Sequence, residues 1–193
     1  MPEYIDHFRE NCEKQVEGIP GLEEESPGII LDPHQQEAME AVVLAMGGKE
    51  RAFSIVHSCG SGKTILAANL LHASQRAKNN GADRKDLIIT TERALITDIR
   101  QELEGLKLDI GVWGAGAKDL DHPVVLASIQ VLQCNRGELS RWLPPSRNDL
   151  LIGDEADSYL TEKRKAIIRA LQAQVKIGLT ATPSDYIERD TFK

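Results

Sequence analysis

The stretch SIVHSCGSGKTILAANLL, residues 54–71, decides the fold. An apolar run is followed by a loop of small residues and then by an apolar helical pattern. Glycines inside the loop allow a tight turn, whose N–H groups can surround a phosphate together with the N-terminus of the following helix. A chance cluster of small residues is the alternative, but this strand–loop–helix context predicts a phosphate-binding loop. Lys63 would then contact the β and γ phosphates, and Thr64 would bind Mg²⁺.

The rest of the chain alternates apolar runs with helical patterns. Strands are expected at 52–56, 86–91, 108–112, 122–128, 149–154 and 175–180. Helices are expected at 34–48, 63–78, 92–104 and 162–174, with a broken helix at 129–142. This alternation predicts an α/β fold: a doubly wound, mostly parallel sheet with helices on both faces. Ligands of such sheets bind at the carboxyl ends of the strands.

A second candidate motif is LLIGDEAD, residues 150–157, an apolar strand that ends in carboxylates. Asp154 at the strand tip would hold Mg²⁺, directly or through water, and Glu155 would orient and deprotonate an attacking water. A solvated acidic turn is the alternative for this motif alone. Together with the phosphate-binding loop, it predicts the second half of one Mg-nucleotide site.

Charge is distributed unevenly along the 193 residues, whose formal net charge is −7. Residues 1–30 carry eight acidic and two basic side chains, whereas residues 31–193 carry 22 and 21. We expect 1–28 to be an acidic appendage or linker and 29–193 to be the functional domain. The nearly neutral domain can still present a local basic surface to nucleic acid. Three widely spaced cysteines, and the absence from the sequence of a signal peptide or long apolar run, indicate a cytoplasmic protein without membrane contact.

Six elements together resemble the superfamily 2 helicases and translocases. Three of them are the central motifs of that superfamily in the expected order: CGSGKT at 59–64, DEAD at 154–157 and GLTATP at 178–183. The other three are LDPHQQEAM at 31–39, TTERALITDI at 90–99 and VVLASIQVL at 124–132. The resemblance implies a RecA-like domain that binds ATP and Mg²⁺. The resemblance also accounts for His57 at the start of the loop, because the first position of this motif varies within the superfamily, whereas the commonest phosphate-loop pattern has glycine there.

The resemblance also implies roles for individual residues. Nucleotide contacts map to Gln35, which would contact adenine, and to Cys59, Gly60, Ser61, Gly62, Lys63 and Thr64. Coupling of nucleotide state to strand engagement maps to Thr180 and Thr182, and Asp157 is expected to hydrogen-bond to their segment. Nucleic-acid contacts map to Arg93 and Ser128. Three positions depart from the family pattern: Cys59 replaces a threonine, and Thr91 and Glu92 replace a Pro-Thr pair.

The segment GLTATPSDYIERDTF, residues 178–192, most resembles the motors of type I and type III restriction enzymes. This favours DNA over RNA as the partner and implies a second RecA-like domain in the same full-length chain. Arginine fingers of that domain support hydrolysis, so ATP hydrolysis is expected only when it is present. A nucleotide-binding regulatory or docking module without motor activity is the alternative. A small-molecule kinase and an ABC-type ATPase are disfavoured, because the first leaves the GLTATP and Gln35 elements without a role and the second needs an LSGGQ-like signature.

Overall fold

The computed structural model describes residues 30–47, 51–58, 60–77, 85–139, 148–159, 161–171 and 173–182. The acidic appendage expected at 1–28 lies outside these residues, as does Cys59 of the phosphate-binding loop. None of the helices within the described part combines the length and apolar character that crossing a membrane requires.

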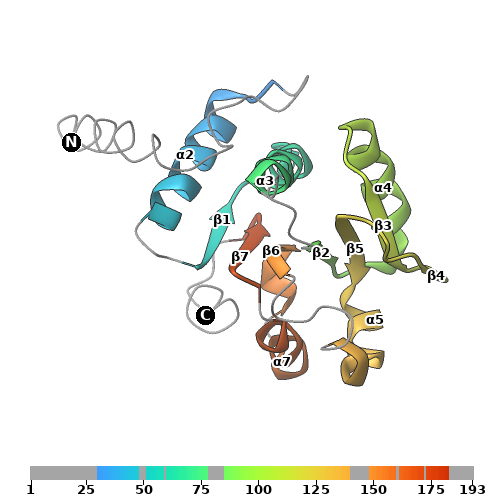
Figure 1. Ribbon diagram of the computed structural model, residues 1–193. Helices are drawn as coiled ribbons and strands as arrows, with labels where there is room; N and C mark the ends of the chain where they lie inside the picture. The colour runs from blue at the N-terminus through green and yellow to red at the C-terminus, as the bar shows by residue number, and fades with distance from the viewer. Residues whose placement is uncertain are drawn as a thin grey trace.

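A single sheet organises the described chain, with the strand order β1-β7-β6-β2-β5-β3-β4 (Figure 1). The strands are β1 (Ala52–Val56), β2 (Lys85–Thr90), β3 (Ile110–Gly114), β4 (Ala117–Lys118), β5 (Val124–Ser128), β6 (Asn148–Asp154) and β7 (Val175–Thr180). All neighbours pair in parallel except β4, which pairs antiparallel with β3. The predicted α/β class with a mostly parallel sheet is confirmed.

Helices cover both faces of the sheet, as Figure 1 shows. One face carries α2 (Pro33–Gly47), α3 (Lys63–Ala77) and α4 (Ile96–Gly105), and the other carries α5 (Ile129–Cys134) and α7 (Glu162–Ala170). Three 3-10 turns, η1 (Arg93–Leu95), η2 (Arg136–Glu138) and η3 (Ala156–Tyr159), connect these elements. The doubly wound arrangement is therefore also confirmed.

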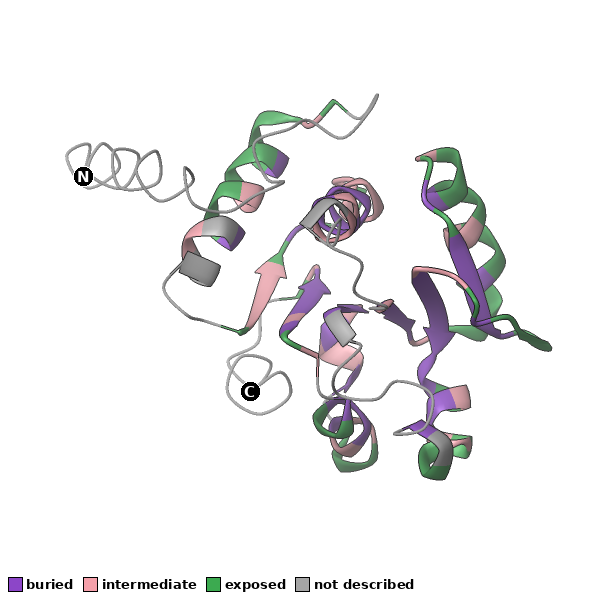
Figure 2. Cartoon of the chain, viewed as in Figure 1, coloured by how far each residue is buried: buried purple, intermediate pink, exposed green. Residues whose placement is uncertain are grey.

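The core divides into two layers because successive side chains of a strand point to opposite faces. In β2, Ile88 packs with the layer that contains α3 and α4, whereas Leu87 and Ile89 pack with α5 and α7. The inner strands are buried almost throughout, in purple in Figure 2, while β1 at the margin of the sheet is mostly half-buried. Burial on both faces explains why the inner strands appear as continuous apolar runs in the sequence.

Several element boundaries differ from the prediction, and the structure explains three of these differences. The helix expected at 92–104 begins as the 3-10 turn η1 and becomes α-helical only at Ile96. The strand expected at 108–112 is shifted to 110–114, because Lys107 turns the chain with a φ of 67° after α4. The helix expected to end at 174 ends at Ala170, since Leu171 takes an extended conformation and packs into the second core layer.

Far from the phosphate-binding loop, His122 joins the starts of β3 and β5 through two carboxylates. Its Nδ1 lies 2.6 Å from Asp109 Oδ1 and its Nε2 lies 3.1 Å from Asp119 Oδ2. The hydrogen bond with Asp109 is the main cause of a raised pKa for His122, partial burial opposes it, and Asp119 adds to it. Both ring nitrogens can donate only in the imidazolium form. His122 therefore makes both hydrogen bonds to the carboxylates when its ring is charged.

This geometry predicts that His122 stabilises the fold in acid. A histidine whose pKa is raised in the folded state contributes stability below its usual pKa of about 6.5, and the contribution is lost as pH rises through the raised value. Replacement His122→Ala should therefore lower the thermal midpoint more at about pH 5.5 than at about pH 9. Equal losses at both values would show that the charge is not involved.

Candidate functional site

Three neighbouring strands end at the same level and carry the predicted site. In the sheet register, Val56 at the end of β1 pairs with Thr180 of β7, and Asp154 at the end of β6 pairs with Leu179 of β7. The strand that precedes the phosphate-binding loop and the strand that precedes the carboxylates therefore flank β7 on its two sides. Parallel pairing places both sets of side chains at one edge of the sheet.

The loop between β1 and α3 has the backbone that a phosphate-binding turn requires. Gly60 and Gly62 have φ values of +73° and +78°, which glycine adopts without steric cost. The N–H of His57 donates to Thr180 O (2.8 Å), and the N–H of Ser61 donates to Ser58 O (3.2 Å). Helix α3 begins at Lys63, so its N-terminus faces the end of the loop and adds a partial positive charge there.

The lysine and the acidic pair meet, as the sequence predicts. Lys63 Nζ lies 3.2 Å from Glu155 Oε1, and the lysine side chain is only 13% exposed, against 43% for the glutamate. Glu155 has a φ of +51°, which is uncommon for a residue with a side chain and turns the chain directly after β6. The two motifs therefore lie side by side at one edge of the sheet, and their joint role in nucleotide binding stays a prediction.

Asp154 occupies a position where its negative charge is costly. Partial burial raises its pKa first, the adjacent Glu155 raises it further, and Lys63 opposes both effects. A cation near Asp154 would favour the ionised carboxylate over the protonated one. The oxygen donors of Asp154 and of Thr64, the second residue of α3, are of the kind that Mg²⁺ prefers.

Protein side chains alone do not make a metal cage at this edge. Within the described ranges, no group of three or more His, Cys, Asp or Glu side chains is arranged to hold a metal ion. Mg²⁺ in nucleotide sites is usually bound by one or two protein oxygens together with the phosphates. The residues present fit that mode of binding.

Gln35 is buried against the loop at 2% exposure. Its Oε1 accepts a hydrogen bond from the Asp32 N–H (3.0 Å), and its Nε2 donates to Ser61 O (3.0 Å). The side chain therefore ties the start of α2 to the loop. Contact of Gln35 with adenine stays a prediction, and in this structure its amide already has partners within the protein.

The predicted hydrogen bond between Asp157 and the segment of Thr180 and Thr182 is present, at the last residue of β7. Thr180, fully buried, donates from Oγ1 to Asp157 Oδ1 (2.8 Å) and accepts from the Thr182 N–H (3.1 Å). Tyr159 follows the acidic turn (residues 154–157), and its buried hydroxyl donates to Ile89 O (2.7 Å) in β2. Sequence reasoning did not identify Tyr159, because the DEAD pattern ends two residues before it.

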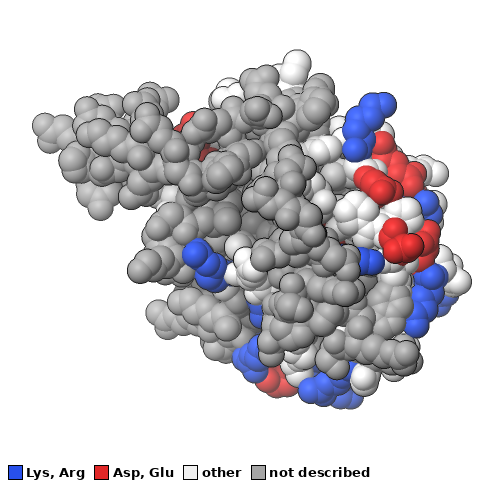
Figure 3. Space-filling view, viewed as in Figure 1, with Lys and Arg blue, Asp and Glu red and all other residues white. Residues whose placement is uncertain are grey.

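The two predicted nucleic-acid residues have different surroundings. Arg93 is exposed in η1, just beyond the end of β2. Ser128 is fully buried, and its Oγ accepts from the Val131 N–H (3.3 Å) at the start of α5. A role for Ser128 in nucleic-acid binding stays a prediction, and the geometry favours a helix-capping role. Figure 3 shows basic and acidic side chains interspersed over the described part of the visible face, without a continuous basic surface there.

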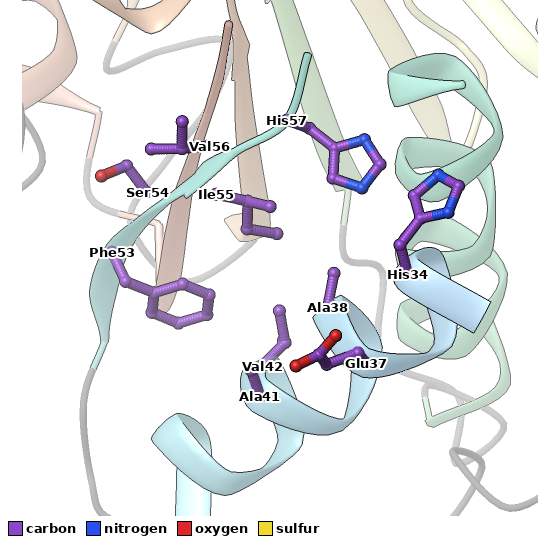
Figure 4. Close-up of a pocket in the computed structure, with 10 residues that line it drawn as sticks. All are labelled: His34, Glu37, Ala38, Ala41, Val42, Phe53, Ser54, Ile55, Val56 and His57. Atoms are coloured by element: carbon purple, nitrogen blue, oxygen red, sulfur yellow. The ribbon is translucent and has the colours of Figure 1, made fainter. Parts of the chain in front are cut away.

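Two adjoining cavities lie between α2 and the end of β1. The one beside the loop has a volume of about 630 Å³, and the one lined by α2 and β1 has a volume of about 520 Å³. His34 and His57 line both, and their rings stack with centroids 4.8 Å apart and an interplanar angle of 26° (Figure 4). Sequence analysis assigned neither histidine a role. Their spacing in the sequence carries no signal, and only the packing of α2 beside the loop brings them together.

The sequence and the fold of this chain are similar to those of known proteins. Residues 28–185 match the family described as "Type III restriction enzyme, res subunit". Among solved structures, the fold resembles the Sulfolobus solfataricus SWI2/SNF2 ATPase core in complex with dsDNA (19% identity, TM-score 0.64) and the UvsW helicase of bacteriophage T4 (20%, 0.64). It also resembles a nuclease-deletion mutant of the type ISP restriction-modification enzyme LlaGI in complex with a DNA substrate mimic (18%, 0.61). No curated protein matches the sequence.

The matched region is a small part of two of these structures. The alignments cover 86%, 95% and 84% of this chain, but 36%, 65% and 18% of the SWI2/SNF2, UvsW and LlaGI chains. At these identities the similarity establishes the fold. The predicted RecA-like architecture is confirmed by it.

Two glycines of the loop offer a matched test of its geometry. Both have positive φ, but a Cβ at Gly62 would collide with the Gln35 amide nitrogen, whereas one at Gly60 meets nothing within 4 Å. Replacement Gly60→Ala should cost about 1–2 kcal/mol of stability through backbone strain alone. Gly62→Ala should cost more and should also weaken nucleotide binding more, because it displaces Gln35. Thermal unfolding and ATP titration of both variants test this, and equal effects would contradict it.

Proposed function

The chain belongs to the family of the type III restriction enzyme res subunit, and we propose that it is the ATP-binding first motor domain of a superfamily 2 DNA helicase or translocase. The observation that carries the proposal is the 3.2 Å contact between Lys63 Nζ and Glu155 Oε1, beside Asp154. It brings the proposed phosphate-binding lysine and the proposed catalytic acidic pair to one edge of the sheet. ATP hydrolysis would be coupled here to movement along DNA.

Binding of the nucleotide depends on the loop and the start of α3. Loop N–H groups and the Lys63 ammonium would hold the β and γ phosphates. The Thr64 hydroxyl and the Asp154 carboxylate would hold Mg²⁺, which neutralises charge on the phosphates when bound. Lys63 has to exchange Glu155 for a phosphate oxygen as the nucleotide binds, and this exchange frees the glutamate.

Glu155 is the proposed general base. Its side chain is 43% exposed, so a water molecule can reach it. Once released from Lys63, the carboxylate can accept a proton from the water that attacks the γ phosphate. Asp154 is the last residue of β6, and its half-buried position suits a ligand of Mg²⁺ better than a general base.

Thr180 is the proposed link between hydrolysis and movement. Its hydroxyl bonds Asp157, which lies two residues after Glu155, and its backbone carbonyl accepts from the His57 N–H at the start of the loop. A displacement of either nucleotide motif therefore reaches the end of β7. Thr182, which follows Thr180 and is exposed, would transmit the change to a second domain or to DNA.

We propose two partners for the chain: DNA, and a second RecA-like domain of the full-length protein. Support for DNA comes from the solved structures of similar fold that contain dsDNA or a DNA substrate mimic. On this chain, the exposed Arg93 beyond β2 is the strongest candidate for a phosphate contact. Cytoplasmic location is part of the same proposal.

Two substitutions separate binding from hydrolysis. Lys63→Ala should abolish ATP binding, because Lys63 supplies the positive charge at the start of α3 and its neighbours Thr64 and Ile65 are uncharged. Glu155→Gln in the full-length protein should retain ATP binding and lose hydrolysis, because the amide cannot accept the proton. Equilibrium titration and steady-state phosphate release measure the two effects. Unchanged binding by the Lys63 variant would remove the assignment of the loop.

The coupling role of Thr180 is tested by a double-mutant cycle with Asp157. Thr180→Val keeps the shape of the side chain and removes the donor hydroxyl, and Asp157→Ala removes the acceptor oxygens. In the full-length protein, each should reduce DNA stimulation of ATP hydrolysis while ATP affinity stays the same. The double variant should be no worse than either single one, since both break the same bond. Additive losses would indicate that the two residues act independently.

A further inference from the structure

His57 lies where three parts of the proposed nucleotide site meet. Its backbone N–H donates to Thr180 O in β7, its ring Nδ1 contacts Ser61 Oγ in the loop, and its ring stacks on His34 at the start of α2. Figure 4 shows the two rings beside each other, one from the end of β1 and one from α2. The whole residue is only 9% exposed. His57 is therefore an internal part of the site.

Hydrogen-bond donors and acceptors determine how His57 acts on Ser61. The Ser61 hydroxyl has one proton, which it donates to Ser58 O. Its oxygen can then only accept from the histidine, so Nδ1 carries the ring proton. The same serine donates its backbone N–H to Ser58 O (3.2 Å) and accepts at its carbonyl from Gln35 Nε2 (3.0 Å).

Ser61 is the residue where such restraint matters most. It lies between Gly60 and Gly62, both with positive φ, and a chain with glycine on either side is otherwise free to adopt many conformations. A loop that is ordered before its ligand arrives loses less entropy on binding. Holding Ser61 therefore favours a loop with one shape.

We propose that His57 is a positioning residue of the phosphate-binding loop, which fixes Ser61 so that the loop is ordered for the polyphosphate part of a nucleotide. The inference rests on the proposed nucleotide binding. Glycine, the residue of the commonest pattern at this position, has neither a ring nor a side-chain donor. In this chain the donor reaches Ser61, and the stack on His34 keeps the ring aimed at it.

Substitutions at position 57 can separate the donor from the ring. His57→Asn keeps a short N–H donor near the place of Nδ1 and lacks the ring, whereas His57→Phe keeps a ring for the stack and lacks the donor. We expect His57→Ala and His57→Phe to weaken Mg-ATP binding about three- to tenfold, the effect of one hydrogen bond. His57→Asn should recover most of the loss. His72→Ala is the matched control, because that ring bonds Leu106 O (2.8 Å) between α3 and α4 and should leave affinity unchanged.

A ligand without a base and a variant without the serine hydroxyl test the route of the effect. Mg-tripolyphosphate should lose the same factor as Mg-ATP in the Ala and Phe variants, because the loop binds only phosphates. In a Ser61→Ala background, His57→Ala should have no further effect. A loss confined to ATP, a loss that persists without the Ser61 hydroxyl, or wild-type affinity in the Phe variant would each overturn the proposal.

The same titrations distinguish this inference from the proposed function. ATP binding that is insensitive to Lys63→Ala would reject the nucleotide site itself. Binding that depends on Lys63 but not on His57 would reject the positioning role alone. Thermal midpoints of all variants identify any that fail to fold, and the Asn and Phe variants then carry the comparison.

Discussion

The contact between Lys63 and Glu155 exists because β7 lies between β1 and β6 and ends level with both. The two residues are distant in the sequence, and each follows the end of its own strand. Parallel pairing across β7 sets their separation at two strand spacings, and the turns that follow the strands bring the side chains together. The site therefore depends on the register of three strands more than on any single loop.

β7 also collects the other contacts of the site. Its last residue, Thr180, accepts from the His57 N–H on the β1 side and donates to Asp157 on the β6 side. Because Thr180 is fully buried, neither bond can be replaced by water without loss. The phosphate-binding loop and the acidic turn are thus connected through one threonine, which gives a physical basis for communication between them.

The sequence was sufficient for the architecture and for the proximity of the two central motifs, for reasons that individual residues illustrate. Strands β1 and β7 have the predicted bounds because polar residues mark their ends: Arg51 and His57 flank β1, and β7 follows Gln174 and ends in Thr180. Strand β4, two exposed residues long, has no apolar pattern and was not predicted. The end of α7 was placed too late, since Leu171 leaves the helix to fill the core without a glycine or proline to signal it. The bonds of Gln35 and the stacking of His34 on His57 were missed because they depend on how α2 packs, which spacing along the chain does not encode.

β1 lies at the edge of the described sheet, and this position affects how easily the strand can move. Within the described sheet, the strand that leads into the phosphate-binding loop is hydrogen-bonded on one side only, and its residues are less covered than those of the inner strands. A strand with a single neighbour yields more readily than one held between two. The strand that leads into the loop can therefore shift more easily on its open side than toward β7, to which its backbone is hydrogen-bonded.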